Sequence, residues 1–495
     1  MYTIYTYLLL GCLLRLSPVP GTYNILDFGA IPDGQTLNTA AIQRAVDSCA
    51  AHGGGRVLFP PGRFLSGSIC LKSGVELHLS AGAALFGSTR RIDYDKNNWY
   101  ALLLAHSQHH IAVTGSGTID GQGSALAADV DRMYKEGLLK DAYRDNRVHE
   151  SQRPQLIDFE QCTDIRIQGI TLRNAACWVQ RYGACDQLRI ENIRVESRAY
   201  WNNDGIDLVD CTNTLVRRCD IDAADDGICL KSDRRERACN NICIEDCRIR
   251  SSASALKFGT NSYGGFKNIQ VKNLEVYDTY RSAIALEIVD GGVLDNVQIE
   301  NVRARNTGNA LFLRLGHRNQ RVPPGQFRRV YIRNVKVQIP EGKPDKGFVL
   351  EGPPAKTAQN TAPIVMAGLP GHPLEGIRLE NIRMEHPGGG QTQLAWLPID
   401  SLHRVPECPK DYPEFSMFGE LPAWGLYARH VTDLRLQNIQ LTAARPDYRP
   451  AVVVDDVGKL SGKRVRLSAP DMTKKVVLKG VGEANGKWIN KAVLK

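Results

Sequence analysis

The chain has 495 residues, of which 43% are hydrophobic and 23% are charged, and its formal net charge is +9. This composition excludes a generally disordered protein. The positive charge mildly favours acidic partners such as uronate polymers or nucleic acid, but no run of lysine or arginine accompanies it. Charge alone therefore identifies no binding partner, and we expect none among nucleic acids.

The first 21 residues are expected to form a signal peptide. A short apolar run, Tyr7–Leu16, precedes a polar segment and is too short to span a membrane. No lysine or arginine precedes this run. Cys12 ends a stretch that resembles a bacterial lipoprotein box, so a lipid anchor at Cys12 is the alternative. We expect an exported protein that is periplasmic or extracellular, and the alternative is a bacterial lipoprotein. We expect no membrane-spanning segment.

An amphipathic helix is predicted over residues 38–49. Its apolar positions 42, 45, 46 and 49 follow helical spacing, Asn38 or Thr39 supplies the N-cap, and Gly53-Gly54-Gly55 ends it. Short β-type runs follow, at 56–59, 75–79 and 111–113. The helix is therefore expected to cap the start of a larger β structure.

A repeat then becomes plain, with apolar and polar residues alternating on both sides of a polar turn. Between residues 165 and 297 its copies begin 23, 27, 27, 27 and 28 residues apart. Alternation with period two, repeated at this interval, is typical of a parallel β-helix. The copies begin at Ile165, Leu188, Leu215, Ile242, Ile269, Val297, Val330, Ile377 and Leu434.

The predicted fold is all-β, a right-handed parallel β-helix with an N-terminal capping helix. It is assigned to residues 22–457, and residues 458–495 are expected to form a β-rich tail packed on its end. Capped ends favour a monomer over end-to-end association. The longer intervals after residue 297 predict inserted loops, which usually gather on one face and often line a binding site.

The insertion between residues 386 and 432 is rich in aromatic residues. Two interpretations remain open: the side chains stack on sugar rings beside a groove, or they pack the loop against the coil. The residues concerned are Trp396, His403, Tyr412, Phe415 and Trp424.

The 13 cysteines do not predict a metal centre. Cys239, Cys243 and Cys247 are spaced four residues apart, but in a strand-like run they would face different parts of the coil. We predict no metal and no cofactor. Five others fit small buried positions within the repeat: Cys162, Cys185, Cys211, Cys219 and Cys229.

Two acidic clusters mark the candidate site. Asn202 and Asp204 precede Gly205-Ile206-Asp207-Leu208, and Asp225 and Asp226 precede Gly227-Ile228-Cys229-Leu230, about one repeat later. If each apolar step begins the equivalent strand, the carboxylates stack on one surface. Paired carboxylates cleave glycosidic bonds when one donates a proton and the other activates water or attacks directly. A calcium site is the physical alternative.

A column of charged residues is expected beside these carboxylates. Aligning the apolar members of successive strands places Lys231, Lys257, Glu287 and Arg314 outward on neighbouring coils. The strand separation is about 4.8 Å. Such a column would form the floor of a groove for a polar sugar, or else a solvated face with salt bridges.

These motifs together resemble glycoside hydrolase family 28, the polygalacturonase-like family, over roughly residues 22–457. The resemblance implies a right-handed parallel β-helix and inverting hydrolysis of pectic α-glycosides. It implies Asp225 as general acid, Asp204 and Asp226 as holders of the attacking water, and Asn202 as a positioning residue. The motifs are Asp27-Phe28-Gly29-Ala30, Asp33-Gly34, Gly117-Thr118-Ile119-Asp120-Gly121-Gln122-Gly123, Asn202-x-Asp204-Gly205, Asp225-Asp226 and Gly259-Thr260-Asn261-Ser262-Tyr263-Gly264-Gly265.

Two departures from the family pattern bear on the substrate. The Gly-His-Gly of polygalacturonases is replaced by Ser252-Ala253-Ser254, and their Arg-x-Lys by Ala285-Leu286-Glu287. A glutamate facing a galacturonate carboxylate would repel it, although Lys257, Arg314 or His317 are candidates for a shifted clamp. We therefore expect rhamnogalacturonan or a decorated pectic oligosaccharide rather than plain polygalacturonan. The long loops after residue 340 could close one end of a groove, which favours exo action.

Two other functions remain alternatives. A calcium-dependent polysaccharide lyase shares the architecture but needs an arginine base beside its calcium carboxylates. A non-catalytic carbohydrate-binding β-helix would explain why two motif elements are missing.

Overall fold

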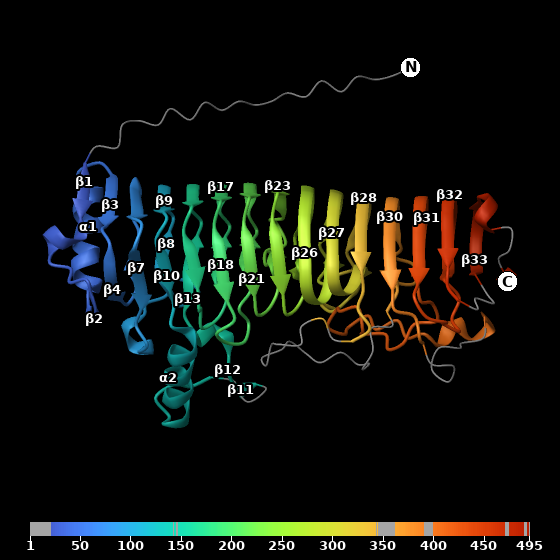
Figure 1. The fold of residues 1–495 in the computed structure, drawn as a ribbon, viewed down its shortest axis with the longest axis horizontal. Coiled ribbons are helices and arrows are strands. Elements are labelled where there is room, and N and C mark those ends of the chain that lie inside the picture. Colours follow the sequence, from blue (N-terminus) through green and yellow to red (C-terminus); the bar gives the residue numbers. More distant parts are fainter. Residues whose placement is uncertain are drawn as a thin grey trace, which may run out of the picture.

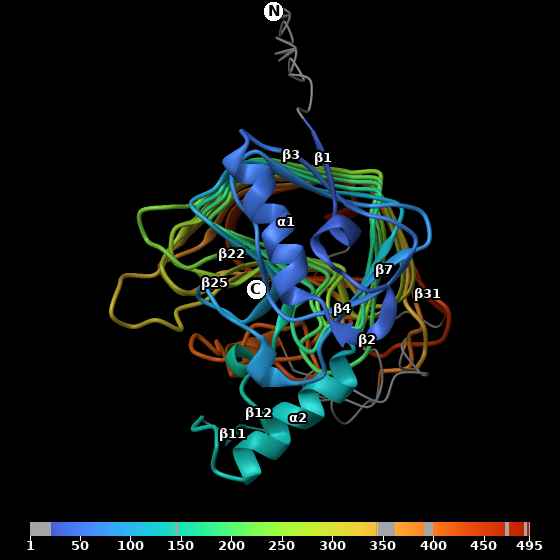
Figure 2. The same ribbon diagram turned by 90° about the vertical axis from the view of Figure 1, so that its left-hand side faces the viewer.

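The computed structural model describes residues 21–141, 143–144, 147–342, 344, 362–390, 399–470, 475–489 and 493–494 (Figure 1). The chain winds into one long parallel coil, and α1 lies across its N-terminal end (Figure 2). The expected signal peptide, Cys12 and Trp396 lie outside the described residues. Within the described residues, no helix is long and apolar enough to cross a membrane.

The N-terminal part contains both α-helices and the first turns of the coil. Helix α1 confirms the predicted helix, although Asn38 directs its side chain to Ile31 and Thr36 instead of capping. Its elements are β1 (Thr22–Asn24), η1 (Ile25–Phe28), β2 (Asp33–Leu37), α1 (Thr39–Ala51), β3 (Gly55–Phe59), β4 (Gly62–Ser66), β5 (Ile69–Cys70), β6 (Val75–Leu79), β7 (Ala83–Gly87), η2 (Arg91–Asp93), β8 (Ala101–His106), β9 (His109–Gly115), β10 (Thr118–Asp120) and α2 (Gly123–Lys135).

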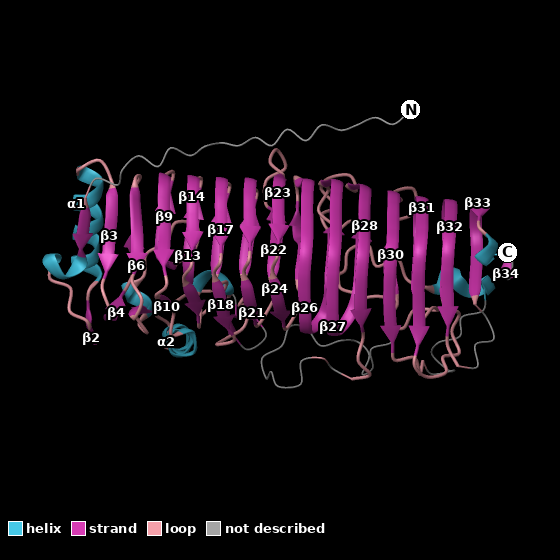
Figure 3. Ribbon diagram, turned by 45° about the horizontal axis from the view of Figure 1, so that its top comes forward, coloured by secondary structure: helices cyan, strands magenta, loops and turns pink. Residues whose placement is uncertain are grey.

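The middle part shows the repeat most clearly, because each turn contributes three separate short strands. Figure 3 shows these strands lying in order along the coil. Its elements are β11 (Tyr143–Arg144), β12 (Arg147–Val148), η3 (Glu150–Gln152), β13 (Gln155–Glu160), β14 (Thr163–Gln168), β15 (Thr171–Arg173), β16 (Gln180–Gly183), β17 (Asp186–Glu191), β18 (Arg194–Ser197), β19 (Ile206–Val209), β20 (Thr212–Arg217), β21 (Asp220–Ala223), β22 (Ile228–Ser232), β23 (Cys239–Glu245), β24 (Arg248–Ser251) and β25 (Leu256–Ser262).

In the C-terminal part, strands of one turn merge into long bent strands. β32 crosses the boundary expected at residue 457, and parallel pairing continues into β33. The elements are β26 (Gly265–Ile288), β27 (Val293–Leu315), β28 (Gln326–Gln338), β29 (Ile364–Ala367), β30 (Leu374–His386), η4 (Ile399–Arg404), β31 (Leu426–Ala443), β32 (Val452–Ser468), β33 (Val476–Asn485), η5 (Lys487–Ile489) and β34 (Val493–Leu494).

Three faces run along the coil. Face 1 contains β14, β17, β20 and β23; face 2 contains β15, β18, β21 and β24; face 3 contains β13, β16, β19, β22 and β25, all paired in parallel. The alternating apolar residues point inward and form one continuous core. The structure therefore confirms the predicted right-handed parallel β-helix.

Asparagines in the repeat make the bend between faces 1 and 2. Asn273, Asn301, Asn334, Asn381 and Asn438 all have φ between 53° and 60°. Asparagine tolerates this left-handed conformation better than most residues. From Asn301 onward, each side-chain amide donates to the preceding asparagine at 2.8–3.0 Å, so the ladder ties five coils together.

Two details of the predicted register are wrong. Leu188 pairs with Thr214, not Leu215, so Thr214 takes the buried place and Leu215 is partly exposed. Lys257 pairs with Cys229 and Ala285 and so leaves the predicted column with Lys231 and Glu287. The shift of Lys257 is two residues and preserves the in–out alternation, so alternation could not exclude it, whereas the shift at Thr214 is one residue and places a threonine where the pattern predicted leucine.

The outward side of face 3 changes character along the coil. Around Asp207 and Lys257 it is charged, whereas Ala285, Phe312, Val365 and Tyr427 form an apolar strip in register with them. Because this strip is apolar, the insertion before β31 packs on it. The covering side chains are Leu402, Val405, Phe415, Met417, Phe418 and Leu421.

Candidate active site

The two predicted acidic clusters lie on adjacent coils at the start of face 3. Asn202 and Asp204 precede β19, Asp225 and Asp226 precede β22, and the backbone N–H of Gly205 donates to the carbonyl of Asp226 at 2.9 Å. The predicted stacking of the two clusters is therefore present.

Glycine is required where these two coils touch. A Cβ on Gly205 would lie 2.5 Å from the carbonyl oxygen of Gly227, and a Cβ on Gly227 would lie 2.7 Å from that of Ala255. The repeated Gly-Ile step thus allows the close approach of coils that brings the carboxylates together.

Asp226 is the carboxylate held in its ionised form. It is only 4% exposed, and burial alone would raise its pKa, but Lys257 Nζ lies 3.1 Å from Oδ2 and the N–H of Ser254 donates to Oδ1 at 3.0 Å. The cations Lys257, Lys231 and Arg281 outweigh burial and lower the pKa of Asp226.

Asp225 meets the opposite environment. Its side chain is half-buried, and burial together with the charges of Asp204 and Asp226 raises its pKa to about 7. Arg281 and Lys257 oppose this rise but do not cancel it. A carboxyl group with such a pKa can carry a proton at neutral pH and donate it.

Asp204 belongs to a second buried group around one ammonium. Lys231 Nζ lies 3.1 Å from Asp204 Oδ2 and 3.1 Å from Cys229 Sγ, and it also donates to Asp207 Oδ1. The aromatic ring of Trp178 lies 4.2 Å from the same ammonium. Burial raises the pKa of Asp204 well above its usual range and that of Asp207 to about 6.

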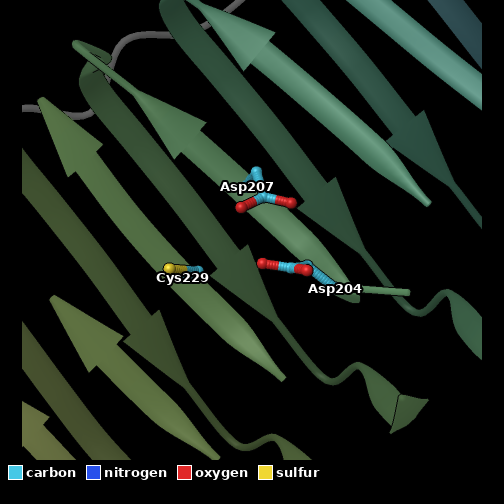
Figure 4. Close-up of side chains that lie close together, drawn as sticks. All are labelled: Asp204, Asp207 and Cys229. Carbon is cyan, nitrogen blue, oxygen red and sulfur yellow. The ribbon is translucent and has the colours of Figure 1, made fainter. Parts of the chain in front are cut away.

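The ligating atoms of Asp204, Asp207 and Cys229 lie within 4.8 Å of one another (Figure 4). Such a group has the donors to hold a metal ion. The ammonium of Lys231 is hydrogen-bonded to all three residues, so a metal ion would have to displace it. The donor set therefore fits lysine as its cation, and it fits calcium poorly because a thiol is a soft ligand.

Asn202 is held by a residue that the sequence did not single out. Arg153 Nη2 donates to Asn202 Oδ1 at 2.6 Å, and Asn202 adopts φ of 58°. Arg153 also donates to the carbonyls of Ala176 and Trp201, so it fixes the turn that leads to Asp204.

Arg281 is the second charged residue that the sequence analysis missed. It is 3% exposed and acts electrostatically on Asp225 and Asp226. The repeat could have indicated Arg281, because this residue lies 28 residues, or about one coil, after Ala253. Its backbone N–H donates to the carbonyl of Ala253 at 2.8 Å.

Glu287 lies near the site but is uncharged at neutral pH. It is 1% exposed, and burial raises its pKa to about 8 despite the opposing charge of Lys257. The expected repulsion between Glu287 and a substrate carboxylate is therefore weakened at neutral pH.

Arg314 and His317 are directed to backbone carbonyls rather than to the carboxylates. Arg314 donates to the carbonyls of Gly368 at 3.1 Å and Cys408 at 3.1 Å, and His317 Nε2 lies 2.7 Å from the carbonyl of Val322. Both side chains are thus engaged by the protein's own backbone.

Aromatic residues of the insertion divide between the two interpretations. Phe415 and Trp424 are buried against the coil, which supports packing. Tyr412 is 46% exposed, and its hydroxyl accepts from Lys257 Nζ at 2.9 Å, so it lies beside the site. His403 is exposed.

The predicted burial of the five repeat cysteines is confirmed. All cysteines of the described residues are free thiols.

A comparison with known families agrees with this arrangement. The family model described as glycosyl hydrolases family 28 matches residues 49–343, which include both acidic clusters. The chain belongs to glycosyl hydrolases family 28. The resemblance inferred from the motifs is thus confirmed.

Individual relatives in family 28 are distant. The chain is 26% identical over 335 residues to a probable polygalacturonase of Vitis vinifera, covering 64% of this chain and 60% of that protein. It is 27% identical over 304 residues to an exo-poly-alpha-D-galacturonosidase of Dickeya chrysanthemi, covering 52% and 50%. The chain thus spans between half and 60% of the length of these relatives.

Solved structures share the fold. The family 28 exopolygalacturonase of Yersinia enterocolitica aligns with a TM-score of 0.60 at 19% identity, covering 94% of this chain and 78% of that one. A hyperthermoactive exopolygalacturonase from Thermotoga maritima aligns with a TM-score of 0.53 at 19% identity, covering 94% and 92%.

Proposed function

We propose that the protein is a glycoside hydrolase that cleaves α-glycosidic bonds of a pectic polysaccharide with inversion. The observation that carries the proposal is the divided protonation of two adjacent carboxyl groups: the pKa of Asp225 is raised to about 7, while that of Asp226 is lowered. Acid–base hydrolysis of a glycoside requires one carboxyl group of each kind.

In the proposed reaction, Asp225 donates its proton to the leaving glycosidic oxygen. Asp226 accepts a proton from the water that attacks the anomeric carbon from the opposite side, so the C–O bond breaks as the new one forms. Asp204 holds this water, and Lys231 fixes the Asp204 carboxylate. Asn202, which is held by Arg153, positions the turn that leads to Asp204.

The proposed substrate is rhamnogalacturonan or a decorated pectic oligosaccharide rather than plain polygalacturonan. Support comes from Ala285 and Glu287, which stand where polygalacturonases have the Arg-x-Lys pair that grips a galacturonate carboxylate. Lys257 is the proposed substrate-binding cation, since its ammonium lies between Asp226 and Tyr412. Exo action is proposed because the insertion covers face 3 on the C-terminal side of the carboxylates.

An exported location is part of the proposal, because a polymeric substrate of this kind lies outside the cell. Mass spectrometry of the mature N-terminus would distinguish cleavage near residue 21 from acylation at Cys12.

The test is reducing-sugar release by the purified protein from polygalacturonan, rhamnogalacturonan and pectic side-chain oligosaccharides, with Asp225→Asn alongside. We expect release from the latter two, reduced about 10²–10⁴-fold in the variant. A chelator should leave the activity unchanged. Unsaturated products absorbing in the ultraviolet, lost on chelation, would instead identify the lyase. No sugar release from any of these substrates would favour the non-catalytic carbohydrate-binding β-helix.

A further inference from the structure

A small closed space lies between the carboxylates and the insertion. It has no room for a water molecule, and its lining includes Ser254, Lys257, Arg281, Glu287, Pro413 and Glu414. The first four come from the coil and the last two from the insertion, so a segment far away in sequence closes the site on this side.

Arg281 is incompletely paired in this space. Within the described part of the chain, its Nε and Nη2 have no hydrogen-bond partner, although the side chain is 3% exposed. A buried guanidinium without partners is costly, which indicates a place for an anion. The carboxylate that meets it is Glu414, whose Oε2 lies 3.4 Å from Nε, too poorly aligned for a hydrogen bond.

The insertion covers both cations next to Asp226. The Tyr412 hydroxyl accepts from Lys257 at 2.9 Å, and Glu414 lies against Arg281. Ser416 Oγ donates to Glu414 Oε1 at 2.9 Å and holds this carboxylate in place. Because Glu287 is uncharged at neutral pH, Glu414 supplies the negative charge on this side of the space.

We propose that Glu414 is a specificity-determining residue: its carboxylate occupies the anion position at Arg281, so the adjoining sugar subsite accepts a neutral sugar and refuses a uronate. A uronate carboxylate would meet like charge in a site from which water is largely excluded, where electrostatic interactions are strong. A neutral sugar avoids this repulsion and can stack on the exposed ring of Tyr412. The inference rests on the proposed function and names the residue that sets its substrate class.

The test compares two disaccharides that differ only in charge, digalacturonate and α-1,4-linked galactobiose. Binding is measured by calorimetry to the full chain carrying Asp225→Asn, so no turnover interferes. Glu414→Gln should tighten digalacturonate binding about tenfold and change galactobiose binding less than about twofold. The gain should change little between about 50 mM and about 300 mM salt, because salt screens buried charges weakly.

Two variants separate this effect from a general change in the insertion. Glu420→Gln is the matched control, because Glu420 lies on the same insertion but faces Arg449, 3.8 Å away. It should leave the preference unchanged. Adding Arg281→Gln to Glu414→Gln should abolish the gain. If Glu414→Gln fails to fold, Ser416→Ala should shift the preference in the same direction by a smaller factor.

An unchanged preference in Glu414→Gln, or an equal gain in Glu420→Gln, would overturn the proposal. So would a gain that persists without Arg281. Binding is measured without catalysis, so the two proposals can fail separately. If Glu414→Gln changes the preference for the charged disaccharide but the protein releases no sugar from any substrate, only the hydrolase proposal is overturned. If the protein hydrolyses a pectic substrate but Glu414→Gln leaves the preference unchanged, only the inference about Glu414 is overturned.

Discussion

Asp225 and Asp226 are neighbours in sequence but lie in opposite electrostatic environments. Asp226 faces the ammonium of Lys257 and the N–H of Ser254, whereas Asp225 faces the negative charges of Asp204 and Asp226. Burial raises the pKa of both carboxyl groups, so the position of the cations decides which one is ionised. The division of roles between acid and base therefore follows from one coil's contacts with the next.

The pH dependence of kcat/KM should reflect Asp225. A general acid works only when protonated, so activity should be retained below its pKa and fall as pH rises through about 7. Arg281→Gln removes a cation that lowers this pKa, and the alkaline limb should move to higher pH. The measurement is initial rate against pH, with Lys459→Gln, far from the site, as control. A limb that stays in place in Arg281→Gln would argue against Asp225 as the acid.

Lys231→Met should destabilise the protein strongly. The substitution leaves the buried Asp204 and Asp207 without their shared cation, and breaking a buried ion pair costs about 3–5 kcal/mol. The loss should be greatest near neutral pH. It should diminish as pH falls through about 6, because protonation of both carboxyl groups removes the unpaired charge. Urea unfolding at pH 5 and pH 7 measures this, and equal losses at the two pH values would contradict it.

At the level of the element, the turn between faces 1 and 2 was encoded in the repeat itself. The copies carry a polar residue, usually asparagine, between their two apolar runs, and that residue adopts the left-handed conformation in coil after coil. The sequence did not indicate that the asparagines also bond to one another, because this depends on the register of adjacent coils. The ladder explains why asparagine rather than glycine serves at this bend.

Asn334→Ala should lower the free energy of unfolding by about 1–3 kcal/mol. Alanine is strained at φ of 56°, and the variant loses the hydrogen bonds with Asn301 and Asn381. Asn334→Gly should cost less than Asn334→Ala because glycine relieves the strain but still loses the bonds. Lys336→Ala on the same strand is the control, expected within about 0.5 kcal/mol of the parent. A glycine variant less stable than the alanine variant would contradict the role of φ.

At the scale of the whole molecule, the insertion covers part of face 3. It packs on the apolar part of face 3 and reaches back to the carboxylates through Tyr412, whose bond to Lys257 spans 155 residues of sequence. Face 3 is thus covered on the side where the coil continues toward its C-terminus. This cover is the physical basis for proposing attack at chain ends.

An exo-acting enzyme should shorten its polymer without a rapid loss of viscosity. We expect reducing ends to accumulate well before the viscosity of rhamnogalacturonan falls, because each cleavage removes only a terminal unit. Simultaneous viscometry and reducing-end assay on one reaction mixture would measure this. A steep early fall in viscosity would show internal cleavage and contradict the proposed exo action.

The sequence by itself determined the coil, its capping helix and the two stacked acidic clusters. All three rest on local patterns: alternation, helical spacing and a repeat of about 27 residues. Because successive copies stack directly, residues one repeat apart become neighbours, and the proximity of Asp204 and Asp226 could be predicted without a structure.

Only the tertiary structure decided the register and what faces the carboxylates. Lys257 lies two residues away from its predicted column, a shift that alternation does not detect. The contacts of Tyr412 and Glu414 join an insertion to the coil and follow no repeat. The pKa values of Asp225, Asp226 and Glu287 depend on burial and on those contacts, so no local pattern encodes them.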